Sequence, residues 1–345
     1  MRERENKKES GNVGKQEGER VEEEESEMEG IEDLEGQEEL QRRQFEREYL
    51  AWLKFSAREI AESLRRLSAE RREEIFAFYE MVLREPEKMH SPLSSDERKR
   101  LERILGGGVR AGAEVAGVAE VAEVDAAEAV EERASIRGAG RLRSIVLLKT
   151  PAVVFAHAIF PASSFFDVGV AMHRRFFVGG RWFAVISLNA SYLEIASDAM
   201  LRYLLEHELI QGEMYEELAR MNVRHLSPEL KGAYHEAARL EAIRRTRISE
   251  EEVRSEEEII RELSLKEPLV PTGFAASSIY LHLLRNYEAL KHFGWESRDN
   301  MEREWERLSH EFASWIEFSV HSFGVFVSEL KRLVRSADEF SVEFV

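Results

Sequence analysis

The sequence of 345 residues predicts an α+β fold that is predominantly helical, with a small antiparallel sheet followed by a helical bundle. Three observations predict it. Apolar residues recur at helical spacing in the first third of the chain, after about Glu38. Residues 142–188 change to β-branched and aromatic runs, and from Asn189 to the end the pattern is helical again. Hydrophobic residues make up 43% of the chain, which is enough for a core.

Residues 1–36 are predicted to be a disordered acidic tail, because they have almost no apolar surface to bury. Residues 1–40 hold 6 Lys or Arg against 16 Asp or Glu, a net charge of −10 out of −18 for the whole chain. The remaining −8 is spread over residues 41–345, so that part of the chain lacks the basic surface that a phosphate backbone requires. We therefore expect no nucleic acid among its partners, whereas the tail suits solubility or a basic partner.

Residues 37–106 are predicted to be an N-terminal helical segment. Its first helix, about residues 38–66, has a broad band of aromatic and aliphatic residues, which indicates a core position or an oligomer interface. A second helix is expected over residues 69–84. A third begins at the polar cap Ser94-Ser95-Asp96 and ends before the glycines at 106–108. Residues 107–140 have no aromatic residue and are dominated by Ala, Val, Glu and Gly, so we expect low-complexity material, a linker or a weak helix, and the best internal boundary.

Residues 141–345 form the second folded region. The segment FFVGGRWF places Gly179-Gly180 between two apolar runs, which predicts a hairpin with Phe176 opposite Phe183 and Arg174 opposite Val185. The apolar stretch at 150–166 is interrupted by prolines and a histidine, so it is predicted to be buried strand and loop without a membrane span. Helices are then expected at about 196–220, 228–246, 249–264, 274–292 and 298–336.

Several function classes are excluded by residue content. The chain has no Cys, which rules out disulfides, thiolate nucleophiles and Cys-based metal sites. No phosphate-binding loop, dinucleotide fingerprint or serine nucleophile elbow is present. The N-terminus lacks the apolar region of a signal peptide, so we expect a cytoplasmic protein, and the abundance of Glu and Arg is typical of thermophiles.

The helix predicted over residues 196–220 places His207 in its apolar stripe. At 100° per residue, the other polar residue in that sector is Gln211, one turn later. Glu208 lies about 100° round the helix, where it is half exposed. The apolar neighbours of His207 within the sector are Met200, Tyr203, Leu204, Ile210, Met214 and Leu218.

The following helix supplies a possible acidic partner. Its wheel places Glu241 on an apolar side formed by Leu230, Ala233, Ala237, Leu240 and Ile243, and it places His235 on the polar face. If the two helices form an antiparallel hairpin about a loop near residue 224, His207 lies opposite Glu241. The sequence thus predicts that His207, Gln211 and Glu241 converge at one buried point.

The run from Ile186 to Asn189, followed by a helix bearing LLEHEL, resembles the edge strand and metal helix of zincin metallopeptidases. In that family HExxH places two His on zinc and its Glu activates water. Leu240-Glu241-Ala242 is similar to the Glu-ligand segment of the gluzincin branch. The resemblance covers about residues 170–245 and implies that residues 141–345 are a zincin-like domain with a C-terminal helical extension.

Carried over by residue, the resemblance implies zinc as cofactor, His207, Gln211 and Glu241 as the metal ligands and Glu208 as the catalytic base. The position of the second ligand His is occupied by Gln211, a weaker donor for zinc. The implied function is a metallopeptidase-like domain that is weak or inactive as a peptidase.

His157, His173 and His235 are candidates for lining the cleft of such a domain. In an alternating strand, His173 shares a face with Asp167 and Ala171. The alternative for the whole chain is a non-enzymatic helical scaffold or interaction protein with a protein or peptide partner. In that case His207 is a packed structural residue whose nitrogens are satisfied by neighbours such as Gln211 and Glu241.

Overall fold

The computed structural model describes residues 40–105, 142–156, 167–178, 181–221, 228–286 and 298–342. The predicted acidic tail, residues 1–36, and nearly all of the predicted linker, residues 107–140, lie outside these ranges. By its internal contacts the chain divides into two compact units, Met1–Phe55 and Ser56–Val345. Residues 40–65 are helical, and in the first unit the rings of Phe45 and Tyr49 stack with their centroids 5.9 Å apart. All elements below belong to the second unit.

Polar caps fix the first helices of this unit. Helix α2 spans Ala69–Arg84, as predicted, and the hydroxyl of Ser68 accepts a hydrogen bond from a backbone amide of its first turn. The short 3₁₀ helix η1 (Pro86–Met89) and strand β1 (Ser91–Pro92) follow. Helix α3 (Ser95–Ile104) begins where the sequence predicted, because Ser94 and Glu97 form a reciprocal capping box.

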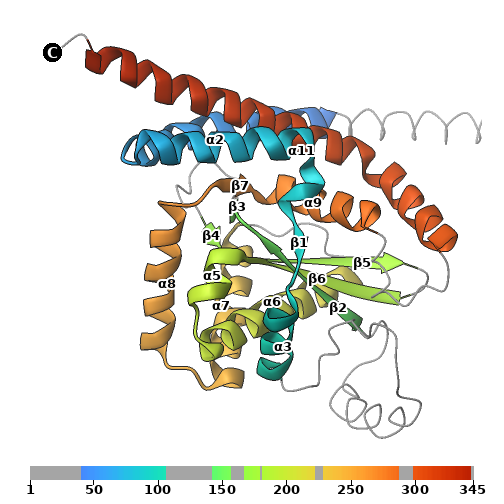
Figure 1. Ribbon diagram of the computed structural model, residues 1–345. Helices are drawn as coiled ribbons and strands as arrows, with labels where there is room; N and C mark the ends of the chain where they lie inside the picture. The colour runs from blue at the N-terminus through green and yellow to red at the C-terminus, as the bar shows by residue number, and fades with distance from the viewer. Residues whose placement is uncertain are drawn as a thin grey trace, which may run out of the picture. The chain divides into compact units, whose positions relative to one another are not determined.

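A four-stranded sheet lies at the centre of the unit (Figure 1). Its strand order is β1, β2 (Leu142–Thr150), β6 (Arg181–Asn189) and β5 (Ala171–Val178). Strands β5 and β6 form the predicted hairpin, with Phe176 opposite Phe183 and Arg174 opposite Val185. The sheet is mixed and not antiparallel as expected, because β2 and β6 pair in parallel. The composition of the two runs had predicted strands but carried no information on their relative direction.

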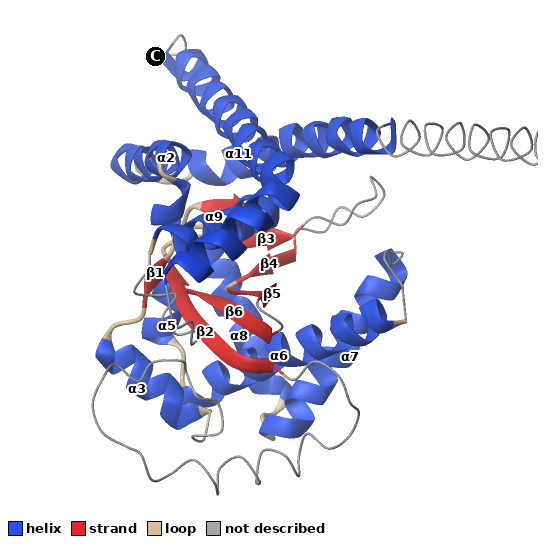
Figure 2. Ribbon diagram, turned by 90° about the vertical axis from the view of Figure 1, so that its right-hand side faces the viewer, coloured by secondary structure: helices blue, strands red, loops and turns tan. Residues whose placement is uncertain are grey.

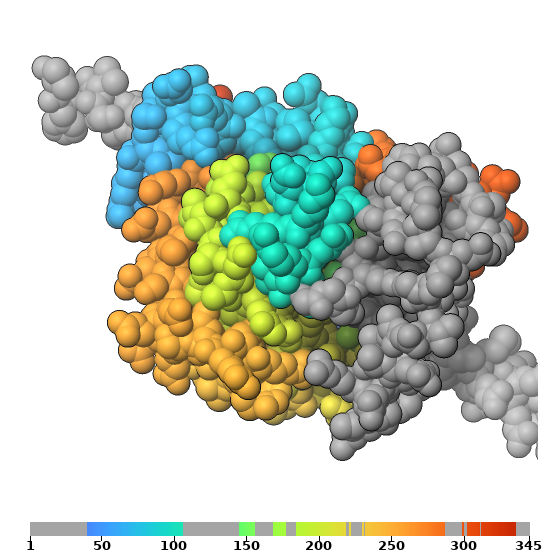
Figure 3. All heavy atoms as spheres, turned by 60° about the horizontal axis from the view of Figure 1, so that its bottom comes forward, coloured from blue at the N-terminus to red at the C-terminus, as the bar shows by residue number. Residues whose placement is uncertain are grey.

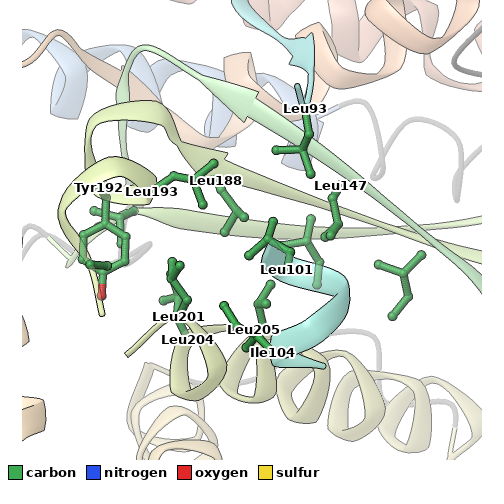
Figure 4. Packing of buried hydrophobic residues seen from close by; sticks show 14 of the residues in the cluster. Leu93, Leu101, Ile104, Leu147, Leu188, Tyr192, Leu193, Leu201, Leu204 and Leu205 are labelled. Atoms are coloured by element: carbon green, nitrogen blue, oxygen red, sulfur yellow. The ribbon is translucent and has the colours of Figure 1, made fainter. Parts of the chain in front are cut away.

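One face of the sheet packs on α3, α5 (Ala190–Ile195) and α6 (Asp198–Arg220). Leucines from the sheet and from α3, α5 and α6 pack together there (Figure 4). The opposite face packs on α9 (Thr272–Arg285) and α11 (Arg298–Val342). There the ring centroid of Phe176 lies 5.3 Å from that of Trp305 and 6.3 Å from that of Tyr280. Beyond this layer α2 packs on α11, and the ring centroids of Tyr79 and Phe323 lie 5.5 Å apart.

A second, three-stranded sheet has the order β4 (Asp167–Gly169), β3 (Val153–Ala156) and β7 (Leu269–Pro271). Residues 153–156 of the apolar stretch are thus a strand, and residues 157–166 lie outside the described residues. The structure corrects the reading of residues 167–173 as one strand. Asp167 belongs to β4 and His173 to β5, which lie in different sheets, so the two residues do not share a face.

The remaining helices are α7 (Pro228–Thr246) and α8 (Glu250–Ser264), both within a residue of the predicted bounds. Figure 2 shows α7 beside α6, on the side away from the strands. In the described part of the chain, no helix is both long and apolar enough to cross a membrane.

Candidate functional site

Helix α6 lies between the sheet and α7, and it uses two faces. Leu201, Leu204 and Leu205 pack against the sheet, whereas Tyr203 and Ile210 pack against α7 and α8. The helix is oriented by its N-terminal end, where the Ser197 hydroxyl accepts a hydrogen bond from the Met200 amide. His207 belongs to the α7 side, as its place in the predicted apolar stripe required.

His207 is buried, with 7% of its surface exposed. The side-chain amide of Gln211 donates to its Nε2 over 2.8 Å, so the proton of the neutral ring resides on Nδ1. The ring stands edge-on to Tyr203 at 6.1 Å and to His235 at 4.8 Å. Burial, with smaller contributions from His235 and Arg239, lowers the pKa of His207 to about 4. At neutral pH the site therefore holds an uncharged imidazole.

The residue of α7 that meets His207 is His235, which the helical wheel had placed on the polar face. The face of α7 that turns inward carries Ala238 and Ala242, both fully buried. The predicted core residues Leu230 and Leu240 are instead 50% and 49% exposed. Small and apolar residues occur almost all round α7, so its sequence pattern did not single out one face.

Glu241 is engaged by arginines on the flank of the helix pair. Its carboxylate accepts hydrogen bonds from Arg244 at 2.6 Å and from Arg245 at 2.9 Å, and these lower its pKa to about 2. Arg245 also reaches Glu206 at 3.6 Å and Glu213 at 3.4 Å on α6. The expected opposition of His207 and Glu241 is thus replaced by the pair His207 and His235, while Glu241 takes part in an ion-pair network.

Glu208 starts a second polar stripe on α6, because Gly212 and Glu216 follow it at intervals of one turn. Gly212 lies under the ring of His173 on β5, so closely that a Cβ at position 212 would lie 2.5 Å from Cε1 of the ring. Glu216 forms a largely buried ion pair with Arg175, two residues further along β5. Glu208 is half-buried, and its charge helps burial to raise the pKa of Tyr215.

His173 is the expected cleft residue that does lie beside α6. Burial, followed by the charges of Arg175 and Arg174, lowers its pKa to about 3. Its Nε2 is buried without a hydrogen-bond partner among the described residues. His235 is exposed on α7, and His157 lies outside the described residues.

The structure therefore brings together His207, Gln211 and His235 on one face of α6, and His173 and Gly212 on another. Across the described ranges, no group of three or more His, Asp or Glu side chains is arranged to hold a metal ion. The contact at Gly212 was not predicted, although a Gly inside a helix is a known sign of close approach. The run from Ile186 to Asn189, compared above with an edge strand, lies in the interior strand β6, and the edge strand is β5.

Comparisons with known proteins add no relative. No protein-family model, curated protein or solved structure matches the chain.

Proposed function

We propose that the protein carries a metallopeptidase-like domain whose incomplete zinc motif leaves it weak or inactive as a peptidase. The observation that carries this proposal is the hydrogen bond from the Gln211 amide to Nε2 of His207. In an HExxH helix the side chain one turn after the first His binds the same metal as that His. Here Gln211 instead donates a hydrogen bond to the Nε2 lone pair of His207, the lone pair that a zinc ion would need. Both groups are neutral, which favours a packed site without metal.

The surroundings of the pair support the same conclusion. A catalytic zinc site combines three protein ligands with an open position for water. His207 lies in an apolar environment with Tyr203 on one side and His235 on the other. Glu241, the implied third ligand, already receives hydrogen bonds from two arginines, and a carboxylate held in this way is costly to redirect.

A second candidate is a non-enzymatic helical scaffold or interaction protein. It is favoured by the outward face of α7, on which Leu230 and Leu240 are about half exposed. Ala233 and Ala237 lie between them and are also exposed, so that an apolar stripe faces solvent. Exposed apolar surface of this kind is typical of protein or peptide interaction sites. In this case His207 is a structural residue of the α6–α7 packing.

The Gln211→His variant distinguishes the two candidates, because it restores the second His of the motif. We expect untagged wild-type protein to contain no stoichiometric zinc after incubation with excess zinc and dialysis. A metallopeptidase-like ancestry predicts that Gln211→His takes up about one zinc per chain. A scaffold in which His207 is only packed predicts no uptake by either protein.

Two controls make the measurement specific. Glu213→His adds a histidine to the exposed flank of the same helix, and His207→Ala in the Gln211→His background removes the first ligand. Zinc bound by Gln211→His must be absent from both controls. Stoichiometric zinc in the wild type, lost in His207→Ala and accompanied by peptide hydrolysis, would overturn the proposal of an inactive domain.

A further inference from the structure

Helix α8 packs against the core with an inner face that contains one buried carboxyl group. Val253 joins the cluster formed by Tyr203 and Ile210, and Ile259, Ile260 and Leu263 pack against the leucines of the sheet layer. Glu256 lies between these apolar residues and is 2% exposed. The other side of α8 is open to solvent (Figure 3). A charged residue in the centre of an apolar docking face requires an explanation, because burial of an unpaired charge is costly.

The partner of Glu256 is a phenol. The hydroxyl of Tyr192 on α5 donates to its carboxyl group, and the Tyr192 ring is itself almost fully buried. The oxygen of this ring points away from the leucine side chains of the core (Figure 4). A phenol can donate to a carboxylate or to a protonated carboxyl group, but it cannot neutralise a charge. In the part of the chain that the structure describes, Glu256 has no ion pair with Lys or Arg.

Among the side chains that the structure describes, the other titratable groups around Glu256 do not stabilise its charge. Tyr203 of α6 is close enough for Glu256 to raise its pKa, and Glu257 of α8 acts on Glu256 as a like charge. Arg239 of α7 faces Tyr203, but its guanidinium is paired with Glu236 at 2.8 Å. Burial, the largest effect, raises the pKa of Glu256 to about 7, against the opposing hydrogen bond from Tyr192.

We propose that α8 is a pH-sensitive element of this fold: protonated Glu256 docks the helix on α5 and α6, and ionised Glu256 weakens that docking. When α8 is undocked, its carboxyl group is hydrated and has the ordinary pKa of 4.5. The raised pKa of the docked state means that docking is strongest below pH 4.5 and weakens as the pH rises through about 7. Undocking of α8 would also alter the packing of the candidate site, because Val253 of α8 packs in the same cluster as Tyr203, and the Tyr203 ring contacts His207.

Hydrogen exchange of the α8 amides tests this device in the full-length chain. After correction for the intrinsic exchange rate, protection of α8 in the wild type should fall about tenfold between pH 6 and pH 8.5. Glu256→Gln keeps an acceptor for the Tyr192 hydroxyl and cannot ionise, so its α8 protection should be the same at both pH values. Glu258→Gln, an exposed position on the same helix, serves as the matched control and should behave like the wild type.

Two results would overturn the proposal. One is an equal loss of protection in Glu256→Gln and wild type, which would assign the effect to another group. The other is wild-type protection that does not change with pH. If Glu256→Gln does not fold, a carbon-13 titration of the Glu256 carboxyl group in the wild type decides the question. A midpoint near 4.5 would exclude the device, and one near 7 with a matching change in α8 protection would support it.

Discussion

Replacing Gly212 by Ala probes the contact between α6 and the edge strand β5. A Cβ at position 212 would lie 2.5 Å from Cε1, 2.7 Å from Nε2 and 3.2 Å from Nδ1 of the His173 ring. The first two distances are shorter than contacts that Cβ atoms make in proteins, so the ring or the helix has to move. The ring belongs to a largely buried side chain on a strand fixed by its full pairing with β6.

The expected magnitude combines two opposing effects. Ala is better than Gly in a helix interior by about 1 kcal/mol, which favours the variant. Overpacking of a well-filled site costs about 1–3 kcal/mol, because side chains leave their preferred rotamers. We expect overpacking to dominate at this position, with a net loss of up to about 2 kcal/mol in the free energy of unfolding.

Gly232 on α7 is the matched control, because nothing beyond its own stretch of helix backbone lies within 4 Å of the Cβ that an Ala would add there. Gly232→Ala should therefore gain about 1 kcal/mol from helix propensity alone. Urea unfolding of the two variants and the wild type measures the difference. Combining Gly212→Ala with His173→Ala completes a double-mutant cycle, in which the clash should appear as a coupling energy of at least about 1 kcal/mol. Equal stabilisation by both glycine substitutions, with no coupling to His173, would refute the reasoning.

Two further predictions concern buried titratable groups. Arg175→Met leaves the buried carboxylate of Glu216 without its guanidinium and should lower the free energy of unfolding, measured in urea, by about 3 kcal/mol. Adding Glu216→Leu should recover part of that loss. A double variant no more stable than Arg175→Met would contradict this. Burial lowers the pKa of His90 from 6.5 to about 3, so the stability that His90 contributes is complete above pH 6.5 and falls as the pH drops towards 3. Between pH 7 and pH 5 the free energy of unfolding of the wild type should fall by about 2 kcal/mol more than that of His90→Asn, a variant that can keep the hydrogen bond to Ser278. Parallel pH profiles of the two proteins would show that His90 does not cause the loss of stability.

The sequence predicted local structure well where single residues determine it. The cap at Ser94 set the start of α3, and α7 and α8 begin within a residue of the predicted positions. The register of β5 and β6, which ends with Val178 opposite Arg181, is the one that the glycine pair in the sequence predicted. These features act over a few residues, so no knowledge of distant contacts was needed.

Predictions that depended on distant contacts were less successful. The wheel of α6 correctly placed His207 towards an apolar neighbour, because the leucines on its other face made the pattern distinct. The wheel of α7 chose the wrong face, since its alanines allow close packing on either side and Leu240 remains exposed. Glu241 was therefore assigned to the core, whereas its arginine partners lie one turn away on the same helix. Parallel pairing of β2 with β6 could not be predicted either, as it joins residues about 40 positions apart.

The strand connections have a consequence for how the unit Ser56–Val345 unfolds. The chain passes from the four-stranded to the three-stranded sheet through Pro151 and Ala152, where β2 becomes β3, and it returns through Val170, where β4 gives way to β5. The Tyr79 hydroxyl also ties α2 to β7 of the three-stranded sheet, because it donates to the carbonyl of Leu269 and accepts from its amide, each over 3.1 Å. Unfolding of one sheet should therefore disrupt the other, because they share these connections. Thermal unfolding of this unit should then be a single cooperative transition in which the calorimetric and van't Hoff enthalpies agree.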